Sequence, residues 1–344
     1  MLVHHLIEWQ TGDARAVLPG WRAFSVTDAA AVAFFVAAGA SMALFVTSRA
    51  RRGVPRVRVA AQVVRRYGAL VPIGLALDWV FWRNPYMFGV LEALGVTVVL
   101  GAAVAALVPR WALAPVAGAV VIAGVWSERM VEGDQRWLAD EAIGGKFPLV
   151  TYLGFVLIGV VAVRTDWYAS RRRMFGAAAV AVLATVVMLA DGLVPARYPG
   201  DIPFVVPGLA ATILAYVIGQ IRWPRALAAV DTVLRRAAAH TLGIFVGHYL
   251  VYGVLRRYEL LGEVDAAVAV PSTIVITAAL CLMAPRVPQL PWSLRTGRRR
   301  PRRADAPADA APVAVPAVEP AADPAPPTAA GSLPPLPVEP APAG

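Results

Sequence analysis

The feature that most constrains this chain is a succession of apolar runs, each close to the length of a membrane-spanning helix, with charges gathered between them. A helix needs about 20 apolar residues to cross a hydrocarbon core of roughly 30 Å. A composition of 58% hydrophobic and 16% charged residues, with a mean hydropathy of +0.62, lies outside the range of soluble globular proteins. We therefore expect an all-α polytopic integral membrane bundle, with complete spans at 28–48, 66–82, 87–108, 112–127, 147–163, 174–194, 204–221, 240–256 and 264–283.

The first residues, MLVHHLIEWQ, form an apolar stretch that is too short to span. At about 1.5 Å per helical residue, the stretch up to Trp9 extends for roughly 13 Å. We interpret it as the outer end of a truncated first helix, which brings the expected number of spans to about ten. Either its other half lies upstream of Met1 or the chain tolerates a half-span. A cleaved signal peptide is not expected, because the sequence lacks its n-region, h-region and small-residue cleavage site.

Arginine-rich segments alternate with mixed or acidic ones along the chain. RARRGVPRVRVAAQVVRR, RTDWYASRRR, RWPRALAAVDTVLRR and TGRRRPRR all fall on one side if the N-terminal stretch counts as the first span. The positive-inside rule assigns this side to the cytoplasm. The sequence thus predicts a multi-pass protein of the cell membrane whose C-terminus is cytoplasmic. The same loop pattern accounts for the net charge of +10 without a nucleic-acid partner.

The composition changes near residue 291. Residues 1–290 are expected to form the membrane domain, and 291–344 a basic and then Pro/Ala-rich cytoplasmic tail that is disordered and partly polyproline II. A small folded partner-binding module is the alternative for the tail. Cys281 is the single cysteine, so neither a disulfide nor a cysteine-based metal site is expected. Membrane lipid is an expected partner, and a homodimer is compatible with the sequence.

Ionisable side chains inside apolar spans are the strongest functional signal, because each is costly in a bilayer unless it meets a partner or a watery cavity. A histidine beside a carboxylate in a protected cavity can activate a hydroxyl or an amine as a general base. Asp78 and Glu92 are acids in the middle of predicted spans, where a purely structural role is rare. The residues of this kind are His4, His5, Asp28, Asp78, Glu92, Asp191 and His248.

Structural roles remain open for several of these residues. His4 and His5 suit interfacial positions near Trp9, Asp28 suits a helix N-cap, and His248 suits a bond to a neighbouring helix backbone. Arg65 and Arg66 open a span at the cytoplasmic face, where they suit a phosphate-rich ligand or the positive-inside bias equally well. No Walker loop, dinucleotide fingerprint, HExxH or cysteine zinc spacing occurs in the sequence.

Three segments in order resemble the catalytic region of the heparan-α-glucosaminide N-acetyltransferase family of multispan transmembrane acyltransferases. They are WRAFSVTDAAAVAFFVAAGASMAL (21–44), FGVLEALGVTVVLGAA (88–103) and TLGIFVGHYLVY (241–252). Each is weakly specific alone, and the resemblance extends over roughly residues 1–283. Glu92 stands where that family commonly has Gln, a difference that bears on acceptor recognition. Leu18 stands where human-type members have their active histidine.

The resemblance implies a helical bundle that takes acetyl-CoA, or another short acyl-CoA, from the cytoplasm and acylates a sugar or amine at the outer face, with no metal. It makes Arg65 and Arg66 candidates for the CoA phosphates. It makes Asp28, His248 and one of His4 or His5 candidates for catalysis. Independently of the resemblance, Asp78, Glu92 and Asp191 are expected to line the substrate cavity, because acids within spans are costly elsewhere and Asp78 and Asp191 lie toward the outer level of their spans. Related bacterial acyltransferases place a histidine near the outer end of the first helix, which matches His4 best.

Two other function classes remain open. A transporter or lipid flippase would also need buried acids around a cavity, but the internal repeat typical of transporters is not evident. An accessory scaffold acting through its Pro-rich tail would have no use for mid-span acids.

Overall fold

The computed structural model of the chain describes residues 26–82, 89–130, 147–193, 202–220, 224, 232, 241–257 and 266–283. The chain divides into two units, Met1–Ser293 and Leu294–Gly344, and every described residue lies in the first unit. The predicted half-span at the N-terminus and the predicted tail at 291–344 lie outside the described residues.

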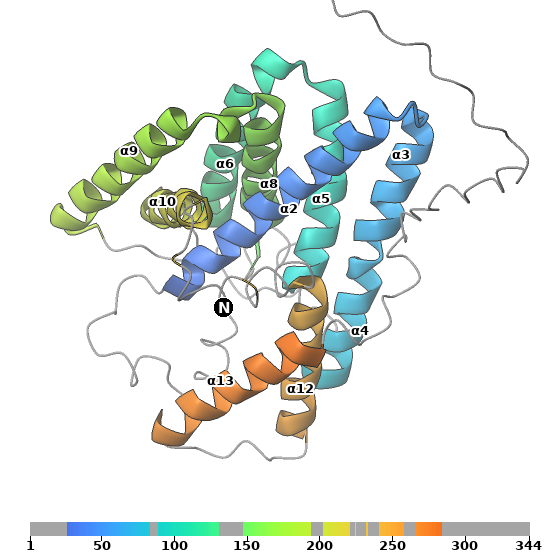
Figure 1. Cartoon of the computed structure of the whole chain (residues 1–344), viewed down its shortest axis with the longest axis vertical. Helices are drawn as coiled ribbons and strands as arrows, with labels where there is room; N and C mark the ends of the chain where they lie inside the picture. The colour runs from blue at the N-terminus through green and yellow to red at the C-terminus, as the bar shows by residue number, and fades with distance from the viewer. Residues whose placement is uncertain are drawn as a thin grey trace, which may run out of the picture. The chain divides into compact units, whose positions relative to one another are not determined.

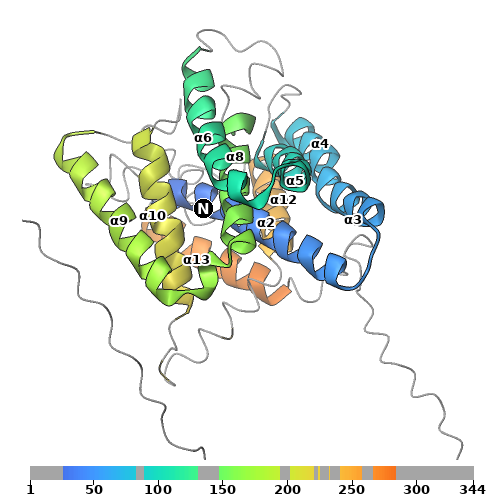
Figure 2. The same cartoon turned by 90° about the horizontal axis from the view of Figure 1, so that it is seen from above.

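All secondary structure in the described ranges is helical (Figures 1 and 2). Five of the helices, namely α2, α5, α6, α9 and α10, are long and apolar enough to cross a membrane, and α8 is apolar but shorter. The expected all-α class is confirmed for these residues, and the number of about ten spans stays a prediction. The helices are α2 (Val26–Arg51), α3 (Arg56–Val63), the π-helical turn η1 (Val64–Gly68), α4 (Leu70–Trp82), α5 (Val90–Leu107), η2 (Arg110–Ala112), α6 (Leu113–Met130), α8 (Leu149–Arg164), η3 (Trp167–Ala169), α9 (Arg171–Ala190), α10 (Ile202–Gly219), α12 (Thr241–Arg257) and α13 (Ala266–Met283).

Two of the long helices end at a glycine in the left-handed region. Gly53 has φ +70°, and the amides of Gly53 and Val54 donate to the carbonyls of Ala50 and Arg49 at 3.0 and 3.1 Å. Gly192, with φ +76°, closes α9 in the same way. This pair of bonds satisfies carbonyls that a helix end leaves unpaired, and glycine adopts the required φ without steric cost. The turn at Gly53 sends the chain into α3.

Glycines let the central helices approach backbone to backbone. A Cβ at Gly39 of α2 would overlap the carbonyl oxygen of Val156 in α8, and a Cβ at Gly159 of α8 would overlap that of Val36. Gly124 of α6 meets Thr151 of α8 just as closely. In a bilayer, where no hydrophobic effect draws helices together, small residues that permit such contact are a main source of association. The trio α2, α8 and α6 is therefore the tightly packed centre of the described fold.

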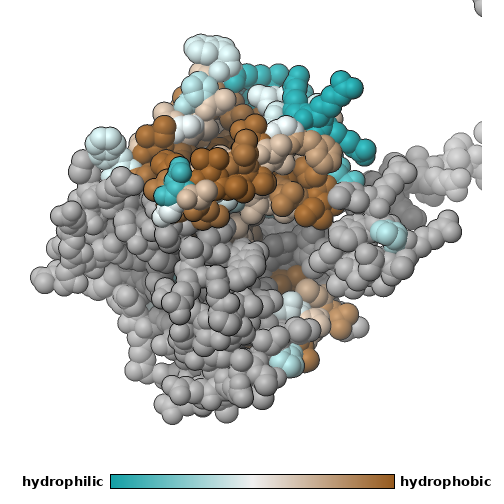
Figure 3. All heavy atoms as spheres, turned by 90° about the vertical axis from the view of Figure 1, so that its left-hand side faces the viewer, coloured by the Kyte–Doolittle hydropathy of each residue, from teal (hydrophilic) through white to brown (hydrophobic). Residues whose placement is uncertain are grey.

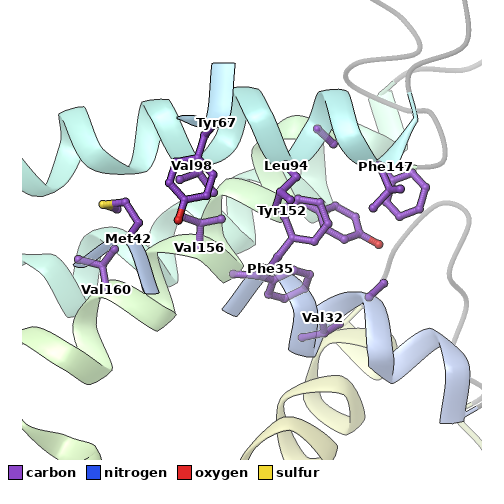
Figure 4. Packing of buried hydrophobic residues seen from close by; sticks show 14 of the residues in the cluster. Val32, Phe35, Met42, Tyr67, Leu94, Val98, Phe147, Tyr152, Val156 and Val160 are labelled. Carbon is purple, nitrogen blue, oxygen red and sulfur yellow. The ribbon is translucent and has the colours of Figure 1, made fainter. Parts of the chain in front are cut away.

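An aromatic cluster fills the space beside this contact (Figure 4). The rings of Phe35 and Tyr152 lie 4.5 Å apart in an edge-to-face arrangement, and Phe147 lies 5.5 Å from Tyr152. Phe35 and Phe155 are fully buried. Edge-to-face pairs add about 0.5–1.5 kcal/mol beyond the area that they bury.

In contrast to these buried side chains, the long apolar side chains of α9 are largely exposed. Val180 and Leu183 are 69% and 63% exposed. Figure 3 views the side on which α9 lies in Figure 1 and shows hydrophobic residues over most of the described surface, with hydrophilic ones mostly along its upper edge. An apolar surface of this kind suits contact with lipid tails.

Candidate active site

Two carboxyl groups from neighbouring helices are buried side by side. Asp78 lies one turn before the end of α4, and Glu92 lies in the first turn of α5. The two helices pack against each other in opposite directions (Figure 1), so the ends that carry the acids lie at one level. Asp78 is 5% exposed and Glu92 is 1% exposed. Acids this deeply buried in an apolar bundle are a strong functional signal.

Two glycines make room for the pair. Asp78 Oδ2 and Glu92 Oε2 each lie 2.9 Å from the point where a Cβ on Gly89 would stand, so both carboxyl groups converge on this residue. The Glu92 carboxyl also packs directly against Gly74, where a Cβ would overlap it. Any larger residue at either position would displace an acid. The sequence analysis named both acids and missed both glycines, although Gly89 lies directly before α5.

The two carboxyl groups lie close together at Gly89. Two adjacent carboxyl groups can share one proton, so the pair is able to hold a proton and to receive one. Glu92 Oε1 is buried and has no hydrogen-bond partner within the described part of the chain, which leaves it able to accept a bond from a ligand. The positive end of the α5 dipole lies beside Glu92 and favours negative charge there.

His248 is a further titratable side chain that is fully buried in the described part of the chain. It lies on α12, which packs against α4, the helix that carries Asp78 (Figure 1). The structure thus places His248 and the carboxyl pair on helices in mutual contact.

Arg65 and Arg66 lie in η1, away from the carboxyl pair, and both are exposed. The guanidinium carbon of Arg66 lies 5.9 Å from the ring centre of Phe45 and 5.6 Å from that of Tyr67. Arg49, at the end of α2, lies 5.3 Å from the same Phe45 ring. The sequence analysis missed Phe45 and Arg49, for which the four-residue spacing along α2 was an available signal.

A comparison with known protein families identifies the family to which this chain is related. The family described as heparan-alpha-glucosaminide N-acetyltransferase, catalytic, matches residues 2–194. The chain belongs to this family. A search of curated proteins and a search of solved structures each found no match. Members of the heparan-alpha-glucosaminide N-acetyltransferase family use acetyl-CoA as acetyl donor.

The region matched by the N-acetyltransferase family extends from before α2 to the end of α9. It therefore contains the carboxyl pair, the arginines of η1 and two of the three segments that carry the resemblance. The third segment, with His248, lies beyond it, so the assignment of this histidine to a family motif stays a prediction.

The remaining predicted site residues are Asp191, Asp28, His4 and His5. Asp191 caps the end of α9 and is exposed. Asp28 lies in the first turns of α2, but its side chain is outside the described structure, as are His4 and His5. No group of three or more His, Cys, Asp or Glu residues in the described ranges could hold a metal ion.

Proposed function

We propose that this chain is a membrane acetyltransferase that moves an acetyl group from cytoplasmic acetyl-CoA to an amine or hydroxyl of a sugar or amine acceptor at the outer face. The observation that carries the proposal is the buried Asp78–Glu92 pair within the region matched by the N-acetyltransferase family. A generic membrane scaffold has no need of two adjacent buried acids, whereas acyl transfer needs a group that removes a proton from the acceptor.

The proposed chemistry uses the carboxyl pair at the acceptor. An acceptor amine attacks the thioester carbonyl, a C–N bond forms, and the C–S bond to coenzyme A breaks. The carboxyl pair takes the proton that the amine loses, and the coenzyme A thiolate finally receives it. His248, and His4 or His5, are the alternative bases that the sequence suggests. Arg65 and Arg66 are proposed to hold the phosphates of the donor.

The distribution of charge supports two opposite sides for donor and acceptor. Arg49 and Arg51 lie at the end of α2, Arg164 at the end of α8, and Arg171 at the start of α9. Because successive spans alternate in direction, these ends belong to one side, and the ends of α4 and α5 with the carboxyl pair belong to the other. The positive-inside rule assigns the arginine ends to the cytoplasm.

The test is acetyl transfer by the purified full-length chain in lipid nanodiscs, with radiolabelled acetyl-CoA and glucosamine as the first acceptor. We expect labelled N-acetylglucosamine in proportion to the amount of protein. Absence of transfer to glucosamine and to a panel of other amines and sugars, with the protein still monodisperse, would contradict the proposal. Uptake of glucosamine into liposomes without acetylation would instead support a transporter.

The route of transfer gives a further expected result. Direct attack by the acceptor leaves no acetyl group on the protein, whereas an acyl-histidine intermediate would label the protein before acceptor is added. We expect no covalent label after incubation with radiolabelled acetyl-CoA alone, followed by denaturation and gel electrophoresis. Label that is chased into product by acceptor would contradict direct attack.

Sidedness is testable with single cysteines in a Cys281→Ser background. Arg52 lies in the exposed turn after α2, and Asp191 lies at the exposed end of α9. In right-side-out vesicles, a membrane-impermeant maleimide is expected to label Asp191→Cys directly and Arg52→Cys only after permeabilisation. Direct labelling of both, or of Arg52→Cys alone, would contradict the topology.

A further inference from the structure

Two arginines that are distant in sequence share one aromatic ring at the arginine end of α2. The guanidinium carbons of Arg49 and Arg66 lie 5.3 and 5.9 Å from the centre of the Phe45 ring. Arg66 also lies 5.6 Å from the centre of the Tyr67 ring. The four side chains therefore form a continuous series, in the order Arg49, Phe45, Arg66 and Tyr67, which we call the arginine–aromatic cluster.

Local structure explains how the cluster is assembled. Phe45 and Arg49 are four residues apart on α2 and so lie on the same face of that helix. The chain then reverses at Gly53, and α3 brings Arg66 back to α2 through η1. η1 is a π-helical turn. Such turns are rare in proteins overall, and those that occur are often found at functional sites. Tyr67 is buried against α5 and anchors this turn, since Gly95 of α5 lies against its carbonyl oxygen.

Among the described residues, no acid neutralises the positive charge of the cluster. The segment from Arg49 to Arg66 has seven arginines and no Asp or Glu. Within the part of the chain that the structure describes, neither Arg49 nor Arg66 is paired with a carboxylate. Two guanidinium groups held close to one ring repel each other, so an anion between them or beside them would be favourable.

The positive-inside rule alone does not require this arrangement. It requires arginines in the cytoplasmic segment, and Arg56 and Arg58 satisfy it as exposed residues that contact no aromatic ring of the described residues. Arg49 and Arg66 differ because aromatic side chains restrict their orientation. A guanidinium that lies over a ring keeps its N–H edge available, and this planar edge matches two oxygens of a phosphate.

We propose that Arg49 and Arg66, held over Phe45, form a binding site for a phosphate group at the cytoplasmic end of α2 and η1. Two kinds of molecule carry a phosphate group that could reach this cytoplasmic site, namely coenzyme A and an anionic phospholipid. The coenzyme A source rests on the proposed function and extends its donor site to Arg49 and Phe45. The phospholipid source is independent of that function.

The experiment measures binding to the full-length chain without turnover. In the first arm, titration calorimetry follows coenzyme A binding to protein in nanodiscs of neutral phosphatidylcholine. In the second, native mass spectrometry follows phosphatidic acid retained after release from detergent, with phosphatidylcholine as reference. The variants are Arg49→Gln, Arg66→Gln and Phe45→Leu, with Arg58→Gln as control. Arg58 belongs to the same charged segment, is exposed and contacts no aromatic ring within the described ranges, and its replacement changes the net charge equally.

Hydrogen bonds to charged groups contribute strongly to binding free energy. We therefore expect Arg49→Gln and Arg66→Gln each to weaken binding about tenfold or more. Phe45→Leu keeps both charges and removes the ring, and we expect it to weaken binding about fivefold, in line with the loss of cation–π contact. Arg58→Gln is expected to stay within about twofold of wild type because screened surface charge contributes little. Weaker coenzyme A binding by the cluster variants in the first arm identifies the phosphates of the acetyl donor as the ligand. Weaker retention of phosphatidic acid in the second arm identifies a phospholipid headgroup as the ligand.

Two results would overturn the proposal. One is equal weakening by Arg58→Gln and by the two cluster variants, which would mean a diffuse basic surface. The other is the absence of any effect of the cluster variants in both arms. Because neither arm requires acetyl transfer, failure of the proposed function and failure of the phosphate site are recorded separately.

Discussion

Asp78→Asn is expected to reduce acetyl transfer at least about 100-fold, which is the lower end of the contribution of a general base. Asparagine has nearly the same shape and still fits beside Gly89, but it cannot take a proton from the acceptor. The measurement is the initial rate of transfer from radiolabelled acetyl-CoA at saturating donor. Binding of coenzyme A should be unchanged, because the phosphates are proposed to lie at the arginine end.

Two further variants separate catalysis from folding. Asp166→Asn removes an exposed carboxylate in a left-handed position, where φ is 51° and asparagine is also well tolerated, so its rate should equal that of wild type. Glu92→Gln keeps a side chain that can bond to Asp78 and installs the residue that the resembling proteins commonly have. Its rate should stay within about tenfold of wild type, with a changed preference among acceptors. A wild-type rate for a folded Asp78→Asn chain would exclude the carboxyl pair from proton transfer.

Gly159→Ala and Gly39→Ala are each expected to lower the free energy of unfolding by about 3 kcal/mol, at the upper end of overpacking costs. The added Cβ would meet the backbone of the facing helix, Val36 for Gly159 and Val156 for Gly39, and a backbone has no other rotamer to adopt. Denaturant titration in detergent micelles, followed by circular dichroism, measures the loss.

Gly176→Ala is the matched control for these two substitutions. Gly176 lies inside α9, and nothing lies within 4 Å of a Cβ built on it. Alanine is a better helix former than glycine, so this variant should be as stable as wild type or up to about 1 kcal/mol more stable. If the interface variants unfold at the same denaturant concentration as Gly176→Ala, the close contact between α2 and α8 is absent in the folded protein.

The positions of the helices were largely predictable, because an apolar run of sufficient length has few alternatives to a helix in a bilayer. The segment before α4 is the instructive exception. Its arginines indicated a cytoplasmic loop, yet residues from Arg56 onward are helical. Val59 and Val63 are four residues apart and buried on one face, and this short amphipathic pattern was hidden among the exposed arginines.

The carboxyl pair was partly predictable. Asp78 and Glu92 were both singled out as costly mid-span acids, but their contact depends on the antiparallel pairing of α4 and α5 and on the space left by Gly74 and Gly89. Asp191 was assigned to the same cavity from its level in the membrane alone. In the structure Asp191 is the exposed C-cap of α9, and its assignment to the cavity stays a prediction, because level along a span does not fix which face a side chain occupies.

The backbone contact between α2 and α8 has a mechanical consequence. Two helices that meet through glycine have no flexible side chains between them to absorb a displacement, so sliding either one past the other would drive a Cα into a facing carbonyl oxygen. The central helices α2, α8 and α6 are therefore expected to keep their relative positions when other helices move. Any movement that opens a path from one side of the membrane to the other would have to come from the helices around this trio.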